Sequence, residues 1–530
     1  MTITSIDIPI EPSGVARGRA MVERAQWAAK AFATYDIDTV RRIAKAAAMA
    51  GEAVAGQLGK DAVAETGFGV AEHKLLKNVA CSIGIWNTYA DQDFVSPHVD
   101  EQAKLVSLPR PAGVIFALTP STNPVATVFF NIMLALLTRN TIIISPHPFA
   151  ATCSVEAARI MAEAAVAAGA PDGCVQFVET PSLPLISALM QDPRVDVIVA
   201  TGGTPMVRSA YRSGNPALGV GPGNVPVLVD ASARLTDTAA RLVASKSFDN
   251  SILCTNESVL IAEAEIVEPL TAAMKREGAV FLDAEQTAAV KATIFDGDHF
   301  NTAWVGKSAV AIAAAAGITV PAATKILVAP FDLVVPEEML AHEKLCPVLG
   351  MVSVPTAARG IEVARAVLRI AGAGHSAAIH STDARTIMAF STQVPVLRVS
   401  VNVGNSLGSS GIETNLAPSM TIGTGFAGGS SLGANLRPDH LVNHTVIAYN
   451  ADASVPMADF AGIQAWEPPI GHTPAYPYAS NLPQAAQLRA QETGIAPPAS
   501  NSVRYDDGTD EIRDEIRRMV IEELRQILKG

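Results

Sequence analysis

GVIFALTPSTNPVATVFFNIMLALLTRNTIIIS, residues 113–145, decides the fold class. The stretch opens with a short apolar run, 113–118, followed by a turn and then by an apolar helix from Pro124. A second short apolar run, 141–145, comes next and ends before Pro146. Two strand-length runs with one helix-length run between them predict a β-α-β unit, whose strands lie parallel in one sheet.

The same alternation continues outward from this stretch. We expect helices at 15–32, 40–58, 152–168 and 235–248, and strands at 175–178, 195–200, 225–229, 258–262, 325–328, 350–354 and 397–401. Two successive α/β series of this kind predict two parallel-sheet domains with a cleft between them.

The composition favours a soluble protein with small-molecule partners. Hydrophobic residues make up 49% of the 530 and charged residues only 17%, so there is material for large cores. The formal net charge of -12 lacks the basic footprint of a nucleic-acid-binding protein. The most apolar run, 125–137, is shorter than the roughly 20 residues that span a bilayer, so no membrane partner is expected.

The five cysteines indicate a reducing compartment, and we expect a cytoplasmic location. Their number is odd and no CxxC pair occurs, which argues against a disulfide framework and against a zinc site. His342, His440 and His444 show no metal-ligand spacing either, so no metal is expected. The N-terminus shows no secretory signal pattern.

The segment Phe248-Asp249-Asn250-Ser251-Ile252-Leu253-Cys254-Thr255 carries the main candidate for chemistry. Cys254 follows an expected helix and precedes an expected strand, and side chains at such boundaries often face a cleft. A thiolate there can act as a nucleophile when backbone dipoles activate it. The alternative is that Cys254 is one more small buried hydrophobic residue.

Seven motifs in order resemble the aldehyde dehydrogenase superfamily, over about residues 60–450. The similarity is to the CoA-acylating branch, which includes the aldehyde half of bifunctional aldehyde–alcohol dehydrogenases and enzymes of bacterial microcompartments. The motifs are Glu65-Thr66-Gly67, Pro120-Ser121-Thr122-Asn123-Pro124, Ser145-Pro146-His147-Pro148, Ala200-Thr201-Gly202-Gly203, Gly219-Val220-Gly221-Pro222-Gly223-Asn224, the Cys254 segment, and His342-Glu343-Lys344-Leu345-Cys346-Pro347.

The resemblance implies a mechanism for this chain. Cys254 would attack an aldehyde carbonyl, and hydride transfer to a nicotinamide would leave a thioester on the enzyme. Asn123 matches the family's oxyanion donor, together with the backbone N–H of Cys254. The alternative for Asn123 is helix initiation, because Asn before Pro124 commonly begins a helix.

Val220 bears on the fate of the thioester. In hydrolytic members of the family a glutamate lies 34 residues before the nucleophile and activates water, and counting back from Cys254 reaches Val220. Without that base, water attack should be slow, and a thiol becomes the natural acceptor. The implied reaction is a small aldehyde plus CoA plus NAD giving acyl-CoA plus NADH; hydrolysis to a free acid stays open because another carboxylate could substitute. Two further alternatives are a phosphate-dependent semialdehyde dehydrogenase and a catalytically silent scaffold protein.

The resemblance also implies the cofactor-binding residues, with NAD as cofactor and coenzyme A as co-substrate. They are Thr119, Pro120, His147, Pro148, Thr201, Gly202, Gly203, Thr204, Gly221, Gly223, Glu343 and Leu345. Glu343 would hold the nicotinamide ribose; its alternative is a solvated carboxylate beside Lys344. The choice between NAD and NADP stays open, as does the role of His375, which is either a cleft residue or a structural one.

We expect a dinucleotide-binding domain over 1–229, with an oligomerisation strand near 103–110, and a catalytic domain over 230–420. An oligomerisation and return segment follows at 421–454, and its strand near 441–449 would pair across subunits of a homodimer or homotetramer. Residues 455–504 are rich in Pro and Ala and predict a linker. Residues 505–530 predict an amphipathic helix, whose apolar stripe within 510–528 needs a groove. It resembles the peptides that tether enzymes to microcompartment shell proteins, or else it packs on its own oligomer.

Overall fold

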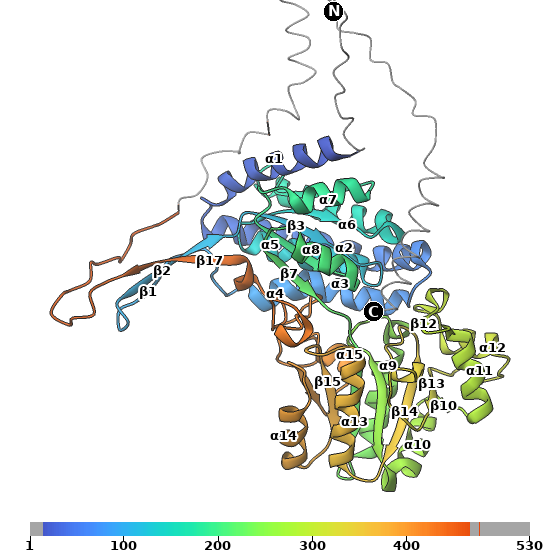
Figure 1. Ribbon diagram of the computed structural model, residues 1–530. Helices are drawn as coiled ribbons and strands as arrows, with labels where there is room; N and C mark the ends of the chain where they lie inside the picture. The colour runs from blue at the N-terminus through green and yellow to red at the C-terminus, as the bar shows by residue number, and fades with distance from the viewer. Residues whose placement is uncertain (1–13, 467–475, 477–530) are drawn as a thin grey trace, which may run out of the picture.

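Two parallel β-sheets, each covered by helices, form the two lobes that Figure 1 shows one above the other. The computed structural model describes residues 14–466 and residue 476. The predicted fold class, two Rossmann-like parallel-sheet domains with a small extension, is confirmed. The strands of the upper sheet run in the order β5 (Val175–Phe177), β4 (Thr141–Ser145), β3 (Val114–Leu118), β6 (Val197–Thr201) and β7 (Ala217–Val220).

Helical elements surround this upper sheet, some packed on its strands and some on other helices. They are α1 (Val15–Phe32), α2 (Ile37–Thr66), α3 (Ala71–Val79), the π-turn η1 (Ala80–Gly84), α4 (Ile85–Tyr89), α5 (Pro124–Leu137), η2 (Pro148–Ala150), α6 (Ala151–Ala167), α7 (Leu183–Gln191) and α8 (Thr204–Arg212). Helix α5 is buried along its whole length, which explains its almost purely apolar sequence. A Cβ at Gly59 of α2 would lie 3.0 Å from the carbonyl oxygen of Ala71, so this glycine lets α3 pack directly against α2.

The lower sheet has seven strands and carries the second α/β series. Its order is β10 (Ala279–Phe281), β13 (Ile326–Pro330), β14 (Val348–Val354), β9 (Glu257–Glu263), β8 (Val225–Val229), β15 (Ala377–His380) and β16 (Val399–Val401). The other elements of this half are α9 (Leu235–Ser247), η3 (Phe248–Ser251), η4 (Ala264–Ile266), α10 (Val267–Arg276), α11 (Ala284–Ile294), the hairpin β11 (Phe295–Asp296) and β12 (His299–Phe300), η5 (Thr302–Trp304), α12 (Ala309–Ala315), η6 (Met339–Ala341), α13 (Ala357–Ile370), α14 (Ala384–Gln393) and α15 (Asn405–Gly408).

Strand β8 differs from the expected domain boundary. We expected residues 225–229 to close the first domain, but β8 pairs with β9 and β15 in the lower sheet. The chain therefore passes from one sheet to the other after Val220, through the four residues 221–224, and not after Val229. The physical reason is that β8 is apolar on both faces and fits the centre of either sheet, so its sequence does not reveal which one it joins.

A three-stranded antiparallel sheet projects sideways from the upper lobe (Figure 1). It contains β1 (His98–Asp100), β2 (Leu105–Pro111) and β17 (Val442–Ala448), and β17 follows η7 (Phe426–Gly428) and η8 (Pro438–Leu441). Strands β2 and β17 pair with each other along their whole length. Most of β17 is exposed; its pairing across subunits stays a prediction.

The expected linker begins in contact with the upper lobe. The indole N–H of Trp466 donates to the Val95 carbonyl at 2.8 Å, and the Arg139 guanidinium lies 4.6 Å from the Trp466 ring. The expected targeting helix lies outside the described residues, as does nearly all of the linker after Trp466. Among the described helices, none combines the length and the apolar character needed to cross a membrane.

Candidate active site

The carboxyl ends of β3 and β6 form the crevice of the upper sheet. From β3 the chain builds outward to β4 and β5 on one side and then returns to β6 and β7 on the other, so the connections diverge between β3 and β6. Ligands of open parallel sheets bind at such a switch point. The expected residues Thr119 and Pro120 directly follow β3, and residues 201–204 end β6 and begin α8.

The turn from β6 into α8 suits a phosphate group. Gly203 is the N-cap of α8, and a Cβ added at Gly202 would meet no atom within 4 Å. The side chain of Thr201 is held in place by a hydrogen bond, because its hydroxyl lies 2.8 Å from the hydroxyl of Thr421. An open glycine turn at a helix N-terminus offers backbone N–H groups to an anion. The residues present therefore fit a dinucleotide pyrophosphate.

His147 and Pro148 follow β4 at the same edge of the sheet. Burial lowers the pKa of His147 to about 4, so its ring is neutral, and Nδ1 accepts a hydrogen bond from the Phe149 N–H at 3.2 Å. Next to them, Glu65 accepts hydrogen bonds from the backbone N–H groups of Thr152 and Cys153, each at 2.8 Å. The Glu65 motif thus caps α6 and holds α2 against this edge.

The crossing between the sheets forms one wall of the site. Residues 221–224 run from the carboxyl edge of the upper sheet to the amino edge of the lower one. A Cβ at Gly223 would overlap the carbonyl oxygen of Cys254 and would lie 3.3 Å from Oε1 of Glu343. A Cβ at Gly221 would instead meet Thr424 at ordinary contact distance. Gly223 therefore brings together the backbone of the crossing, the candidate nucleophile and Glu343.

Cys254 lies in the loop between η3 and β9. Three successive residues before it, Asp249, Asn250 and Ser251, have φ angles of 49°, 51° and 65°, a left-handed conformation that is costly for side chains other than glycine. Asn256 braces the loop from behind, because its Oδ1 accepts from Ser251 Oγ at 2.7 Å and from Lys246 Nζ at 2.6 Å. Cys254 itself remains partly exposed, while the other four cysteines are buried.

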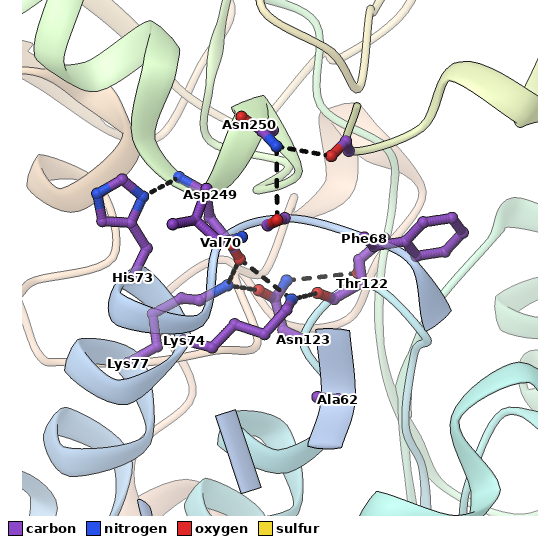
Figure 2. A network of polar contacts seen from close by, with 12 residues as sticks. Ala62, Phe68, Val70, His73, Lys74, Lys77, Thr122, Asn123, Asp249 and Asn250 are labelled. Atoms are coloured by element: carbon purple, nitrogen blue, oxygen red, sulfur yellow. Dashed lines mark hydrogen bonds and ion pairs between the residues drawn. The ribbon is translucent and has the colours of Figure 1, made fainter. Parts of the chain in front are cut away.

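Helix α3 holds the strained turn through one carboxylate (Figure 2). The Asp249 carboxylate accepts from the Val70 N–H at 2.6 Å and pairs with Lys74 at 3.3 Å and with Lys77. The backbone N–H of Asp249 donates to His73 Nδ1 at 2.8 Å. Burial alone would raise the pKa of Asp249, but Lys77 and Lys74 outweigh it, so the pKa lies below its ordinary value and the group is ionised.

Asn123 joins the same network. Its Oδ1 accepts a hydrogen bond from Lys77 Nζ, and its Nδ2 donates to Thr122 Oγ1 at 3.3 Å. Asn123 occupies the N-cap position of α5, but its side chain makes no capping hydrogen bond. Helix initiation therefore does not account for the amide, and the role of oxyanion donor is favoured.

Glu343 lies near Cys254 at the crossing, where both face Gly223. Burial raises its pKa to about 8, which Lys246 and Lys344 offset only in part, so the side chain is largely protonated at neutral pH. Lys344 beside it is fully buried and donates to the carbonyl oxygens of Leu340 and His342, each at 2.6 Å, so the two side chains are not a solvated ion pair. Glu343 itself is partly exposed, and its role at the nicotinamide ribose stays a prediction. The neighbouring Leu345 accepts at its carbonyl from the Gly306 N–H at 2.8 Å.

The thiol of Cys254 is protonated in the free protein. Burial raises its pKa to about 12, with a further contribution from Glu343. Val220, where a hydrolytic enzyme would have its base, is buried at the end of β7 and has no titratable group. Neither nearby carboxylate replaces that base at neutral pH, since Asp249 is paired with lysines and Glu343 is protonated.

Three residues of the site escaped the sequence analysis. The sequence analysis did not single out Lys74, Lys77 or Asp249, although all three are buried. They lie at the left-handed turn of residues 249–251, which is called the nucleophile turn below because it precedes Cys254. The available signal was two lysines three residues apart on a helix whose other face is apolar, which places both on one side. His375, whose role was left open, is buried before β15; Arg398 donates to its carbonyl oxygen at 3.1 Å, and its Nε2 has no partner among the described residues.

Comparison with known proteins identifies the family. The sequence profile of the aldehyde dehydrogenase family matches residues 10–413. This chain belongs to the aldehyde dehydrogenase family. The family predicted from the sequence motifs is thereby confirmed.

Among its relatives is the bifunctional aldehyde-alcohol dehydrogenase of Escherichia coli, 35% identical over 83% of this chain and 50% of the relative. The chain thus spans about half the length of such bifunctional relatives. Among solved structures, an acetylating aldehyde dehydrogenase from Geobacillus thermoglucosidasius is 36% identical with a TM-score of 0.81, covering 84% of this chain and 98% of that one. A propionaldehyde dehydrogenase from Rhodopseudomonas palustris, solved with bound CoA and an acylated cysteine, is 27% identical with a TM-score of 0.73, covering 82% and 97%.

Proposed function

We propose that this chain is a CoA-acylating aldehyde dehydrogenase that converts an aldehyde, NAD and CoA to acyl-CoA and NADH through a thioester on Cys254. The observation that carries the proposal is the absence of a free base beside Cys254 among the described residues. Val220 lacks one, Asp249 is paired with lysines, and Glu343 is protonated below about pH 8. The acetylating relative and the CoA-bound structure support the same reading.

Each side chain then has a defined task. The Cys254 thiol adds to the aldehyde carbon and its proton passes to the carbonyl oxygen, which gives a thiohemiacetal; Asn123 Nδ2 and the Cys254 N–H stabilise the negative charge that develops on this oxygen. The nicotinamide, when bound, supplies the hydride acceptor, and the thioester remains on Cys254. The CoA thiol then attacks the thioester carbon, the bond to Cys254 breaks, and the CoA thiol proton passes to the departing sulfur, which releases acyl-CoA and restores the Cys254 thiol. Glu343 and the turn of residues 201–204 would hold the cofactor's ribose and pyrophosphate.

The choice of acceptor is tested by measuring NADH formation from a series of small aldehydes with CoA, with phosphate and with neither. We expect sustained turnover only with CoA. In its absence a burst of at most one NADH per Cys254 should appear, because the thioester then persists. Equal turnover without CoA would instead establish the hydrolytic enzyme, and turnover with phosphate alone would establish a phosphate-dependent one.

The identity of the nucleophile is tested with two matched cysteine variants. Cys254→Ala should abolish NADH formation, including the burst. Cys346→Ala should leave turnover within about threefold, because Cys346 is a buried packing residue. A Cys254→Ala protein with full activity would contradict the mechanism. A wild-type protein without any activity would favour the remaining alternative, a scaffold protein.

We further propose that residues 510–528 bind a microcompartment shell protein, which would place the enzyme inside such a compartment. The support is the resemblance of this amphipathic sequence to encapsulation peptides, together with its position after a long linker. Fusing residues 510–530 to a fluorescent protein tests the idea. Fluorescence should concentrate in shells when they are coexpressed, and diffuse fluorescence would show that the segment serves another contact, such as one within the oligomer.

A further inference from the structure

Lys77 is a fully buried ammonium group with two acceptors at the nucleophile turn. Its Nζ donates to Asn123 Oδ1 and pairs with Asp249 Oδ2 (Figure 2). Lys74, on the same helix, is buried as well and pairs with the same carboxylate. One lysine would suffice to neutralise one buried carboxylate, and burying a second cation is costly unless it has its own partners. Each lysine has a second acceptor: Lys74 lies 3.4 Å from the backbone carbonyl oxygen of Thr122, whereas Lys77 donates to the side-chain oxygen of Asn123.

The contact fixes which end of the Asn123 amide is available for chemistry. An ammonium group has only donors, so it selects the oxygen of the amide, and the nitrogen must face away from Lys77. Within the described part of the chain Nδ2 has one partner, Thr122 Oγ1 at 3.3 Å, which leaves a second N–H free to donate. A cation bound to the oxygen also polarises the amide and makes its N–H groups stronger donors to an oxyanion.

We propose that Lys77 is a positioning residue for the oxyanion donor. Through Oδ1 it orients and polarises Asn123, and through Asp249 the same ammonium group ties that amide to the turn that carries Cys254. The proposal rests on the proposed aldehyde dehydrogenase activity. It concerns only the first half-reaction, from thiohemiacetal to thioester, and is therefore independent of whether CoA or water takes the acyl group.

Lys77→Met and Lys74→Met form a matched pair. Methionine keeps much of the apolar stem and removes the charge, and in each variant Asp249 keeps one lysine partner. The readout is the rate of the NADH burst without CoA. We expect Lys77→Met to slow the burst about 10–100-fold, a step below loss of a whole oxyanion donor, with little change in the aldehyde concentration for half-maximal rate. Lys74→Met should slow it about threefold or less, and Lys77→Arg should recover part of the loss.

A double-mutant cycle with Asn123→Ala separates positioning from general support of the fold. If Lys77 acts through Asn123, adding Lys77→Met to Asn123→Ala should slow the burst by little more than Asn123→Ala alone. Multiplicative losses would overturn the proposal. Alkylation of Cys254 by iodoacetamide should proceed at nearly the same rate in Lys77→Met, because the thiol is not the target of Lys77. An equal fall in alkylation and burst rates would show that the lysine supports the turn only, and the thermal midpoint checks that each variant is folded.

The outcomes also separate this proposal from the proposed function. If the wild-type burst exists and Asn123→Ala slows it while Lys77→Met does not, only the role of Lys77 fails. If the burst exists but sustained turnover does not need CoA, the acylating function fails and the role of Lys77 is still decided. If the wild-type protein gives no burst with any aldehyde, both are overturned.

Discussion

Asp249 and Glu343 are two carboxylates of the candidate active site, and the chain surrounds them in opposite ways. Asp249 receives two lysines and a backbone N–H, so its pKa lies below the ordinary value. Glu343 receives no hydrogen bond within the described part of the chain, and burial raises its pKa to about 8. Asp249 is therefore a charged group fixed by its partners, whereas Glu343 is a neutral group whose hydrogen-bonding atoms remain available to a ligand.

The largest expected effect comes from making the same carboxylate-to-amide change at both positions. Asp249→Asn should lower the free energy of unfolding by about 3–5 kcal/mol, because Lys74 and Lys77 lose their buried counter-charge. Glu343→Gln should change it by about 1 kcal/mol or less at pH 7, because the wild-type side chain is already mostly protonated. Urea titrations of the two variants measure both values.

The pH dependence of the Asp249 effect has a defined sign. Because the folded-state pKa of Asp249 is lowered, its stabilisation is present at neutral pH and is lost as the pH falls through that lowered value. The difference in free energy of unfolding between the wild type and Asp249→Asn should therefore become smaller in acid. If Asp249→Asn and Glu343→Gln lowered the free energy of unfolding equally at pH 7, the two carboxylates could not differ in charge as stated.

A second test adds one methyl group near Glu343. Gly223→Ala should lower kcat/KM about 100-fold or more, because the new Cβ overlaps the Cys254 carbonyl and displaces the nucleophile. Gly433→Ala is the matched control, since its Cβ would meet Leu397 at an ordinary 3.5 Å. Steady-state kinetics with a small aldehyde measures both, and near wild-type activity of Gly223→Ala would mean that the crossing does not support Cys254.

The smallest expected effect is on the reactivity of the thiol. Above about pH 8 the wild-type Glu343 ionises and its charge contributes to the raised pKa of Cys254. Glu343→Gln should therefore speed iodoacetamide alkylation of Cys254 about threefold or more at pH 9, while the two rates stay close at pH 6.5. The exposed Glu265→Gln serves as control, and a rate ratio that does not change with pH would contradict the assigned ionisation.

The sequence predicted those parts of the fold that depend on local patterns. The run 141–145 coincides with β4, and helix α1 has the expected bounds, because periodicity alone defines such elements. Strand β15 was missed, since Ala377-Ala378-Ile379-His380 is too short and too poor in branched residues to stand out. Helix α2 extends to Thr66, beyond the expected end, because its glycines pack closely against neighbouring elements and do not end it.

The candidate site, too, was predictable only where local motifs define it. The ordered motifs led to Cys254, Asn123 and Glu343, but not to what surrounds them. The spacing of Lys74 and Lys77 places both on one side of a helix but does not reveal the role of Lys77, since lysine is almost always exposed and its acceptors lie 46 and 172 residues away. The protonation of Glu343 depends on burial and on Lys246 of α9, and no spacing in the chain encodes either. Contacts between distant segments set both.

The left-handed turn before Cys254 has a consequence for the order of folding. Each of its three residues costs free energy on its own, and the contacts that offset this cost include distant ones: His73 of α3 is 176 residues from Asp249, and Asn250 donates to the Gly306 carbonyl. Contacts of such long range form late, after the chain between them has collapsed. Cys254 is therefore expected to reach its final geometry only once both lobes have docked. In a partly folded or newly synthesised chain its thiol would keep an ordinary pKa, below the raised value of the folded protein.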